Sequence, residues 1–313
     1  QVHTATPDLA SAGDRQPGAR GVFGGGTPTP SSSTNVIQYL NISSTGNTID
    51  FGDLITTRLA SGTASSSTRG IWAGGSQFPT RVNNIEYITI SSTGDALDFG
   101  DLSGSSTGLS TGVSNSTRGV FGGGDPTLVN TIQYITISST GDTQDFGDLL
   151  GNRRGSNTCS SPTRGIFAGG VPAPSVTDTI EFITLATLGN SQDFGNLVEA
   201  ADFANSNNIS NSTRGVFGGG TTPSFSDRIQ YITISSNGNA QNFGDLSVPS
   251  DTVAGCSSPT RGIFSALRTA TPFTITNIIE YINIQTQGNS VDFGDLLSAS
   301  YIPTGCSNAH GGL

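Results

Sequence analysis

The stretch Ser-Thr-Arg-Gly-Val-Phe-Gly-Gly-Gly at residues 116–124 decides the fold, because near copies of it occur five more times along the chain. Its Arg-Gly pair recurs at intervals of 49, 49, 46, 50 and 47 residues. The six repeat arginines are Arg20, Arg69, Arg118, Arg164, Arg214 and Arg261. Repeats of this length are typical of propellers and solenoids. We therefore expect residues 1–313 to form a single repeat domain.

Each repeat contains four pieces that we interpret as short strands. A variable segment rich in small and polar residues, such as 103–115, precedes Arg-Gly-Val-Phe-Gly-Gly-Gly, where glycines end an apolar pair. Ile-Gln-Tyr-Ile-Thr-Ile follows at 132–137, and the repeat ends in Asp-Phe-Gly-Asp-Leu, as at 98–102. Between these two lies a tight Gly-Asn or Gly-Asp turn. Four short strands in each repeat predict one blade of a β-propeller.

The third piece of the repeat indicates how the blades are packed. Ile132 and Tyr134 point to one face of their strand, and Ile135 and Ile137 point to the other, because side chains alternate along a strand. A strand that is apolar on both faces belongs in a sheet that is covered on both sides. We therefore expect each blade to be wedged between two neighbours, with a β-helix as the alternative architecture.

The repeat resembles that of kelch-type β-propellers, which has an apolar strand ending in Gly-Gly and a later Tyr. It departs from that pattern at the last strand, where the chain has phenylalanine in place of the usual tryptophan, as at Phe51 and Phe99. The pairing of Arg-Gly-Val-Phe-Gly-Gly-Gly with Asp-Phe-Gly-Asp-Leu also resembles repeats in uncharacterised proteins of phages that infect cyanobacteria. The first resemblance implies an all-β, six-bladed propeller of four-stranded antiparallel blades, and the second implies no activity.

Two segments compete for one position in the ring. Residues 297–313 have the pattern of the variable first strand and stop where another Arg-Gly would follow, whereas the start of the chain, 7–19, is shorter than the matching segments. We predict that residues 297–313 supply the innermost strand of the first blade and close the ring. Residues 1–15 are then expected to be a free arm that could pair with a strand edge of a neighbouring subunit.

The amino-acid composition argues against two classes of binding partner, nucleic acids and membranes. The net charge is −10, and lysine is absent, so we expect no nucleic-acid partner. No run approaches the length of a membrane span, so we expect no membrane partner either. The first residue is not Met, as in a secreted or surface protein whose leader has been removed, and as in a truncated chain. We expect an extracellular or virion-surface location.

The recurring motifs are expected to be structural, and no catalytic residue is predicted. Six copies of Asp-Phe-Gly at a fixed period, without a phosphate loop, do not make kinase sites. We expect the repeat arginines to form a structural ring that pairs with the repeat aspartates. No cofactor or metal is predicted, with calcium held by paired aspartates such as Asp98 and Asp101 as the alternative. Hydrolytic chemistry would need a site that breaks the repeat.

Three cysteines occupy one position of the repeat, at Cys159, Cys256 and Cys306. Equivalent positions in separate repeats are usually well apart, so we expect small buried thiols rather than a disulfide. The two histidines do not cluster with them, and this excludes a zinc site.

The segments after Gly-Gly differ between repeats and are predicted to share one rim of the disc. Aromatic side chains can stack on sugar rings, and arginine can bind hydroxyl groups or acidic sugars. The candidate ligand-binding residues on this rim are Phe78, Arg81, Phe225, Arg228, Arg268 and Phe273. Alternatively, the phenylalanines tuck under Pro79, Pro223 and Pro272 and anchor the loops.

These observations favour a non-enzymatic structural or adhesive module of a viral or extracellular appendage, such as a phage tail or fibre. Its expected partners are copies of itself, other appendage proteins and glycans. A carbohydrate-binding propeller is the alternative function, and a glycan hydrolase is the third.

Overall fold

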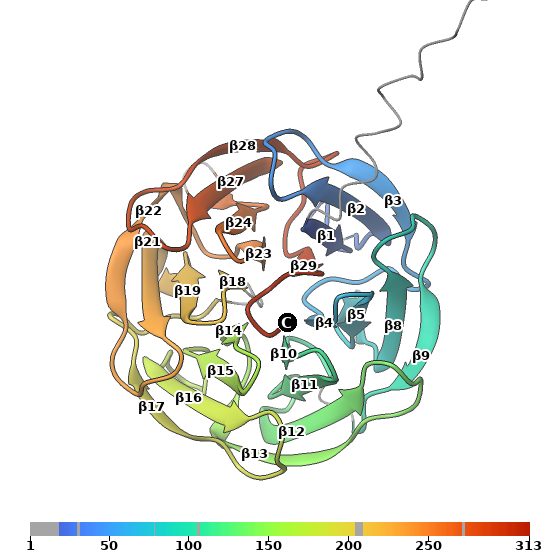
Figure 1. Cartoon of the computed structure of the whole chain (residues 1–313), viewed down its shortest axis with the longest axis vertical. Helices are drawn as coiled ribbons and strands as arrows, with labels where there is room; N and C mark the ends of the chain where they lie inside the picture. Colours follow the sequence, from blue (N-terminus) through green and yellow to red (C-terminus); the bar gives the residue numbers. More distant parts are fainter. Residues whose placement is uncertain (1–18, 30–31, 78, 105–106, 204–208, 271–272) are drawn as a thin grey trace, which may run out of the picture.

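The computed structural model describes residues 19–29, 32–77, 79–104, 107–203, 209–270 and 273–313. These residues form an all-β structure in which six sheets stand around a common axis, each with four antiparallel strands from the axis outward (Figure 1). The predicted six-bladed β-propeller, closed by a terminal strand, is confirmed. In one blade a further short strand, β20 (Thr221–Thr222), pairs with the third blade strand.

In each blade the four strands are named in order from the axis outward. Blade 1 contains β29 (Thr304–Ser307), β1 (Arg20–Gly24), β2 (Val36–Asn41) and β3 (Ile49–Asp53). Blade 2 contains β4 (Gly62–Ser65), β5 (Arg69–Ala73), β8 (Asn84–Thr89) and β9 (Leu97–Asp101). Blade 3 contains β10 (Thr111–Ser114), β11 (Arg118–Gly122), β12 (Val129–Thr136) and β13 (Gln144–Arg153).

The other three blades repeat this order. Blade 4 contains β14 (Asn157–Ser160), β15 (Arg164–Ala168), β16 (Thr179–Thr184) and β17 (Gln192–Asn196). Blade 5 contains β18 (Ile209–Ser210), β19 (Arg214–Gly218), β21 (Ser224–Thr233) and β22 (Gln241–Ser250). Blade 6 contains β23 (Ala254–Ser257), β24 (Arg261–Ser265), β27 (Ile278–Asn283) and β28 (Val291–Asp295). Short hairpins outside the blades are β6 (Ser76–Gln77) with β7 (Thr80–Arg81), and β25 (Arg268–Ala270) with β26 (Phe273–Ile275).

The last strand closes the ring on the first blade. β29 pairs antiparallel with β1, with Cys306 opposite Val22, and thereby supplies the innermost strand of blade 1. The choice of residues 297–313 as the closing segment is therefore confirmed. The predicted free arm at residues 1–15 lies outside the described part of the chain. Closure joins the last blade to the first, so the ring leaves no exposed edge between them.

Hydrophobic side chains fill the space between neighbouring blades. Ile132 belongs to the cluster between blades 3 and 4, against which Tyr134 packs, whereas Ile135 and Ile137 belong to the cluster between blades 2 and 3. The repeat phenylalanine Phe99 lies in that second cluster and is 2% exposed. The prediction that this strand buries both faces is confirmed, because each sheet has a neighbour on either side.

Each repeat arginine lies over an aromatic ring and reaches the next blade. The Cζ atom of Arg69 is 4.4 Å from the centroid of Tyr87, and that ring meets Phe99 edge-to-face at 5.8 Å. The Nη1 atom of Arg69 also donates a hydrogen bond to the carbonyl oxygen of Ile137 in blade 3 (2.8 Å). The other repeat arginines make the same two contacts.

The predicted pairing of the repeat arginines with aspartates is not what these contacts show. Each guanidinium group is instead bound by a carbonyl oxygen and an aromatic face. The turn of each blade, rather than the arginine, makes the hydrogen bonds to the Asp-Phe-Gly-Asp motif. Gly94 N–H donates to the Phe51 carbonyl (2.7 Å), and Asp95 Oδ1 accepts from the Asp53 N–H (3.0 Å).

A second contact between blades uses a buried Gln or Glu of the third strand. In each blade its side chain accepts a hydrogen bond from the backbone N–H of the residue that follows the Asp-Phe-Gly-Asp-Leu motif, or its variant, of the preceding blade, as Gln38 Oε1 does from Leu297 (2.8 Å). The six side chains are Gln38, Glu86, Gln133, Glu181, Gln230 and Glu280. Two of the carboxylates also form buried ion pairs, Glu86 with Arg58 and Glu181 with Arg153.

The three cysteines are free and buried, as predicted. Cys306 lies in the cluster between blades 1 and 2. Burial raises the pKa of its thiol to about 12 and raises the pKa values of Cys159 and Cys256 as well. Thiols with raised pKa values are poor nucleophiles at neutral pH, so these side chains act as small apolar groups.

His310 is buried near the end of the chain, which lies at the centre of the ring in Figure 1, and its ring contacts Ser65, Ser114 and Ser160 of three inner strands. Its Nε2 lies 3.2 Å from the carbonyl oxygen of Ser65, and its Nδ1 accepts a hydrogen bond from the Gly312 N–H (3.1 Å). These partners fit a neutral ring that carries its proton on Nε2, since a proton on Nδ1 would face the Gly312 donor. Burial lowers the pKa of His310 to about 4.

Acidification should therefore weaken the fold through His310. The pKa of His310 is lower in the folded protein than the value of about 6.5 in the unfolded chain. Neutral His310 therefore contributes fully to the free energy of unfolding above about pH 6.5, and this contribution is lost as the pH falls toward 4. Between pH 7 and pH 5 the free energy of unfolding should fall by about 2 kcal/mol more in the native chain than in His310→Gln. Urea unfolding of both proteins at the two pH values measures this difference. Equal losses in the two proteins would contradict the prediction.

Candidate functional site

The axis widens into a cavity at the end opposite His310. The inner strands run from one end to the other: Leu59 and Ala60 line the cavity just before β4, and β4 ends at Ser65, which contacts His310. The closing segment does the same, since Tyr301 and Ile302 line the cavity before β29. The cavity has a volume of about 320 Å³. This size lies at the lower end of the range for small-molecule sites.

One position of the repeat supplies much of the cavity wall. It lies just before the innermost strand. In five blades it forms a β-bridge with the residue that follows Gly-Gly, as Leu59 does with Ser76. The six blades carry five different residue types here: Leu59, Gly108, Arg154, Asp202, Asp251 and Tyr301. All of these except Gly108 line the cavity, and blade 3 contributes Leu109 instead.

Two arginines on the cavity wall are held by aspartates. Arg81 Nε and Nη2 donate to Asp125 Oδ1 (2.7 Å) and Oδ2 (3.0 Å), and Arg81 Nη1 also bonds to Ser76 (2.6 Å). Arg268 pairs with Asp251 through two contacts, one of them Nε to Oδ1 at 2.8 Å. These bidentate pairs fix the geometry of both guanidinium groups and neutralise their charges.

Arg268 is also surrounded by aromatic rings. Its Cζ atom lies 3.9 Å from the ring centroid of Tyr301, 4.4 Å from that of Phe273 and 5.4 Å from that of Phe225. Rings on several sides hold the guanidinium in place and separate it from water. This part of the wall is therefore rigid before any ligand binds.

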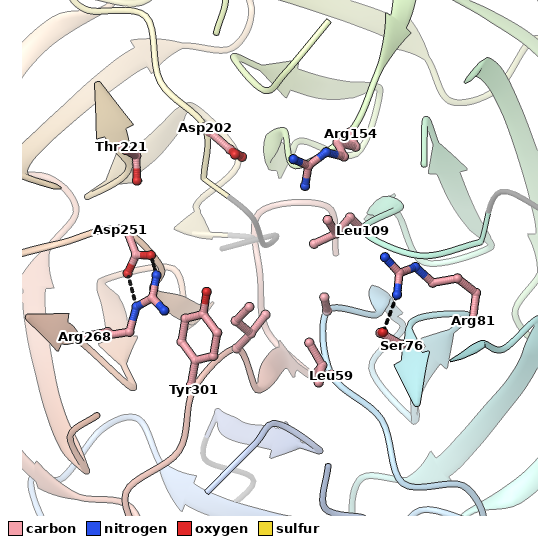
Figure 2. A pocket seen from close by; sticks show the side chains of 12 residues that line it. Leu59, Ser76, Arg81, Leu109, Arg154, Asp202, Thr221, Asp251, Arg268 and Tyr301 are labelled. Atoms are coloured by element: carbon pink, nitrogen blue, oxygen red, sulfur yellow. Dashed lines mark hydrogen bonds and ion pairs between the residues drawn. The ribbon is translucent and has the colours of Figure 1, made fainter. Parts of the chain in front are cut away.

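Arg154 differs from the other two cavity arginines. Its backbone bridges to Val171, but within the described part of the chain its side chain makes no ion pair or hydrogen bond. Figure 2 shows the Arg154 and Asp202 side chains projecting from neighbouring blades toward the opening, with the Tyr301 hydroxyl below them. Arg154 is half-buried, so its charge is partly shielded from solvent.

The Tyr301 hydroxyl remains a hydrogen-bond donor at neutral pH. Burial raises its pKa, Arg268 opposes this effect, and the negative charge of Asp202 adds to it. A phenol whose pKa is raised does not ionise at neutral pH, so it is suited to binding and not to nucleophilic attack.

Part of the cavity lining is apolar. Leu59, Ala60 and Ile302 form a buried cluster, against which Leu109 and Tyr301 pack. Polar and apolar groups together in one lining are typical of sites that bind small molecules. Such a site holds a ligand that has one apolar face and several polar substituents.

The structure brings together only some of the residues predicted from the sequence. Arg81 and Arg268 line the cavity. Phe225 and Phe273 lie against Arg268, and Phe273 is 57% exposed. Arg228 lies outside the cavity lining, with Nε 3.6 Å from Glu199. Phe78 lies outside the described residues.

Sequence reasoning missed Arg154, Asp202, Asp251 and Tyr301. These residues come just before the inner strands, whereas the predicted binding residues lie in the segments that follow Gly-Gly. A signal was present, because aligning the repeats on Arg-Gly shows charged or aromatic side chains at a place where other repeats have Leu or Gly. Nothing in the sequence placed these positions at the axis.

Two general properties bear on the kind of site. Among the residues that the structure describes, no group of three or more His, Cys, Asp or Glu side chains is arranged to hold a metal ion. The described strands and loops include no helix that could span a membrane.

The chain was also compared with known proteins. Its sequence matches no family model, and no curated protein is significantly similar to it.

Proposed function

We propose that this chain is a non-enzymatic, kelch-like propeller module that acts by adhesion, in a viral or extracellular appendage of the kind found in phages. Its partners would be copies of itself, other appendage proteins or glycans, at an extracellular or virion surface. Binding would take place on the face that contains the axial cavity. The repeats themselves, which resemble those in proteins of phages that infect cyanobacteria, would serve as the rigid support.

One observation carries this proposal: the blades share their structural residues but differ at the cavity. The arginine, the paired ring and the buried Gln or Glu recur in every blade because each meets the same surroundings. Around the cavity, equivalent positions carry Leu, Gly, Arg, Asp and Tyr, although the backbone there follows the same path. Packing alone therefore does not dictate these side chains, and a requirement for binding explains the variation.

Carbohydrate binding is the second candidate, and the composition of the cavity favours it. A sugar ring has an apolar face, which suits the apolar lining at Leu59 and Ile302, and hydroxyl groups, which suit Asp202 and Tyr301. Phe273 offers a further exposed aromatic ring beside Arg268. Hydrolysis is the third candidate, and the protonated Tyr301 and the paired Asp251 count against it.

Three measurements on the purified chain test the proposal together. Electron micrographs should show rings or filaments, or a glycan array should show retention of particular glycans, and mass spectrometry should recover those glycans unchanged. Retention without assembly would favour the carbohydrate-binding alternative within the same non-enzymatic class. Cleaved glycans would replace the proposal with a hydrolase. A protein that stays monomeric and retains no glycan would overturn it.

A further inference from the structure

Among the residues that the structure describes, one cation of the axial cavity is available to a ligand. Arg81 and Arg268 are each engaged by an aspartate in bidentate geometry, so their charges are already neutralised. Arg154 has no such partner within the described residues and extends toward the opening (Figure 2). A guanidinium group held in a recess pairs well with a planar carboxylate, because its N–H groups match the two oxygens.

Groups of different chemistry lie on the other sides of the opening. Asp202, from the neighbouring blade, presents a carboxylate, which accepts hydrogen bonds from hydroxyl groups. The Tyr301 hydroxyl, which Figure 2 shows below Arg154 and Asp202, can donate as well as accept. Leu59 and Ile302 add an apolar surface to the lining. The cavity therefore offers a cation, hydrogen-bonding groups and an apolar surface.

The dimensions of the cavity limit the size of the ligand. A volume of about 320 Å³ admits one small ring with its substituents and excludes a bulky oligomer from the interior. A longer glycan could enter only by its terminal residue, with the remainder on the surrounding rim.

We propose that the axial cavity binds a single acidic sugar residue, with its carboxylate on Arg154, its hydroxyl groups at Asp202 and Tyr301, and its apolar face on Leu59 and Ile302. This inference rests on the proposed binding function and names the ligand class for that site. A uronic acid has the required carboxylate and hydroxyl groups on one six-membered ring. Neutral sugars lack the group that Arg154 recognises, and simple carboxylic acids lack the hydroxyl groups.

Isothermal titration calorimetry at low salt tests this ligand class with four probes: methyl glucuronide, methyl glucoside, acetate and alanine. Methyl glucuronide should bind at least about tenfold more tightly than the other three, since a charge-assisted contact contributes that much to affinity. If acetate binds as tightly as methyl glucuronide, the cavity recognises only an anion. If alanine binds more tightly than methyl glucuronide, the ligand class is amino acids. Either result, or no binding of methyl glucuronide at millimolar concentration, overturns the inference.

Two arginine variants locate the site. Arg154→Gln should weaken methyl glucuronide binding about tenfold or more and leave the weaker methyl glucoside binding unchanged. Arg228→Gln, at an arginine outside the cavity lining, is the matched control and should bind like the native chain. Thermal unfolding checks that both variants are folded. Unchanged binding by a folded Arg154→Gln would overturn the inference, whereas the glycan array and micrographs judge the proposed function separately.

Discussion

Replacing Arg58 with methionine should lower the free energy of unfolding by about 3 to 5 kcal/mol, because it leaves Glu86 charged and buried without its cation. Both side chains are fully buried. Burial lowers the pKa of Arg58, and the charge of Glu86 opposes this effect. Urea unfolding followed by the fluorescence of Trp72, the single tryptophan of the chain, measures the loss.

The ring itself supplies the matched control for this variant. Where the third strand has Gln38, Gln133 or Gln230, the residue equivalent to Arg58 is Ser300, Thr107 or Ala201. A neutral amide therefore makes the contact between blades without an arginine. Arg58→Met combined with Glu86→Gln should recover most of the lost stability, since it leaves no uncompensated charge. A double variant as unstable as Arg58→Met would show that the arginine acts through its packing and its carbonyl contacts instead.

Substituting alanine for Gly52 should destabilise the protein by about 1 to 3 kcal/mol more than the same substitution at Gly46. Both glycines have positive φ values, +146° and +153°, so both variants carry backbone strain of about 1 to 3 kcal/mol. Both glycines contact a neighbouring blade, since the Gly46 N–H bonds to the Phe293 carbonyl, but only at Gly52 would an added Cβ atom clash with that neighbour. A Cβ atom there would be 2.5 Å from the carbonyl carbon and oxygen of Gly94, whereas one at Gly46 would meet nothing within 4 Å.

This comparison isolates the contact between blades from the conformation of the backbone. The Gly94 turn cannot move away easily, because its N–H bonds to the Phe51 carbonyl (2.7 Å) and Asp95 bonds to the Asp53 N–H. Unfolding of both variants in urea gives the difference directly. Equal losses would mean that the turn yields to the added methyl group, and that glycine in Asp-Phe-Gly serves only the backbone conformation.

The fixed period of the repeat and the alternation of side chains between the two faces of its strands were sufficient to predict a β-propeller. A fixed period of Arg-Gly implied equivalent units, and the two-faced apolar strand at 132–137 implied sheets covered on both sides. Both expectations depend on local rules of strand geometry, which act within one repeat. The closing role of residues 297–313 followed from the same pattern, because a segment that resembles an inner strand has one vacant place in a ring.

The partners of the charged side chains could not be predicted in this way. The repeat arginines bind aromatic rings of their own blade and carbonyl oxygens of the next blade, 70 residues along the chain for Arg20, and the aspartate turns bind backbone N–H groups of the preceding blade. Sequence offers a nearby aspartate as the obvious partner for each arginine. Which acceptor lies within reach depends on how one blade is rotated against the next.

In the candidate site, too, some features could be predicted from the sequence of each repeat and others depend on how the blades are arranged. The sequence by itself determined six similar blades and a variable rim, since these are properties that each repeat carries in its own residues. Only the tertiary structure decided that Arg154, Asp202, Asp251 and Tyr301 meet at the axis, and that Arg154 alone among the cavity arginines lacks a carboxylate partner in the described chain. The physical reason is that ring closure brings residues from different blades together, and their distances depend on the whole circle of contacts between blades.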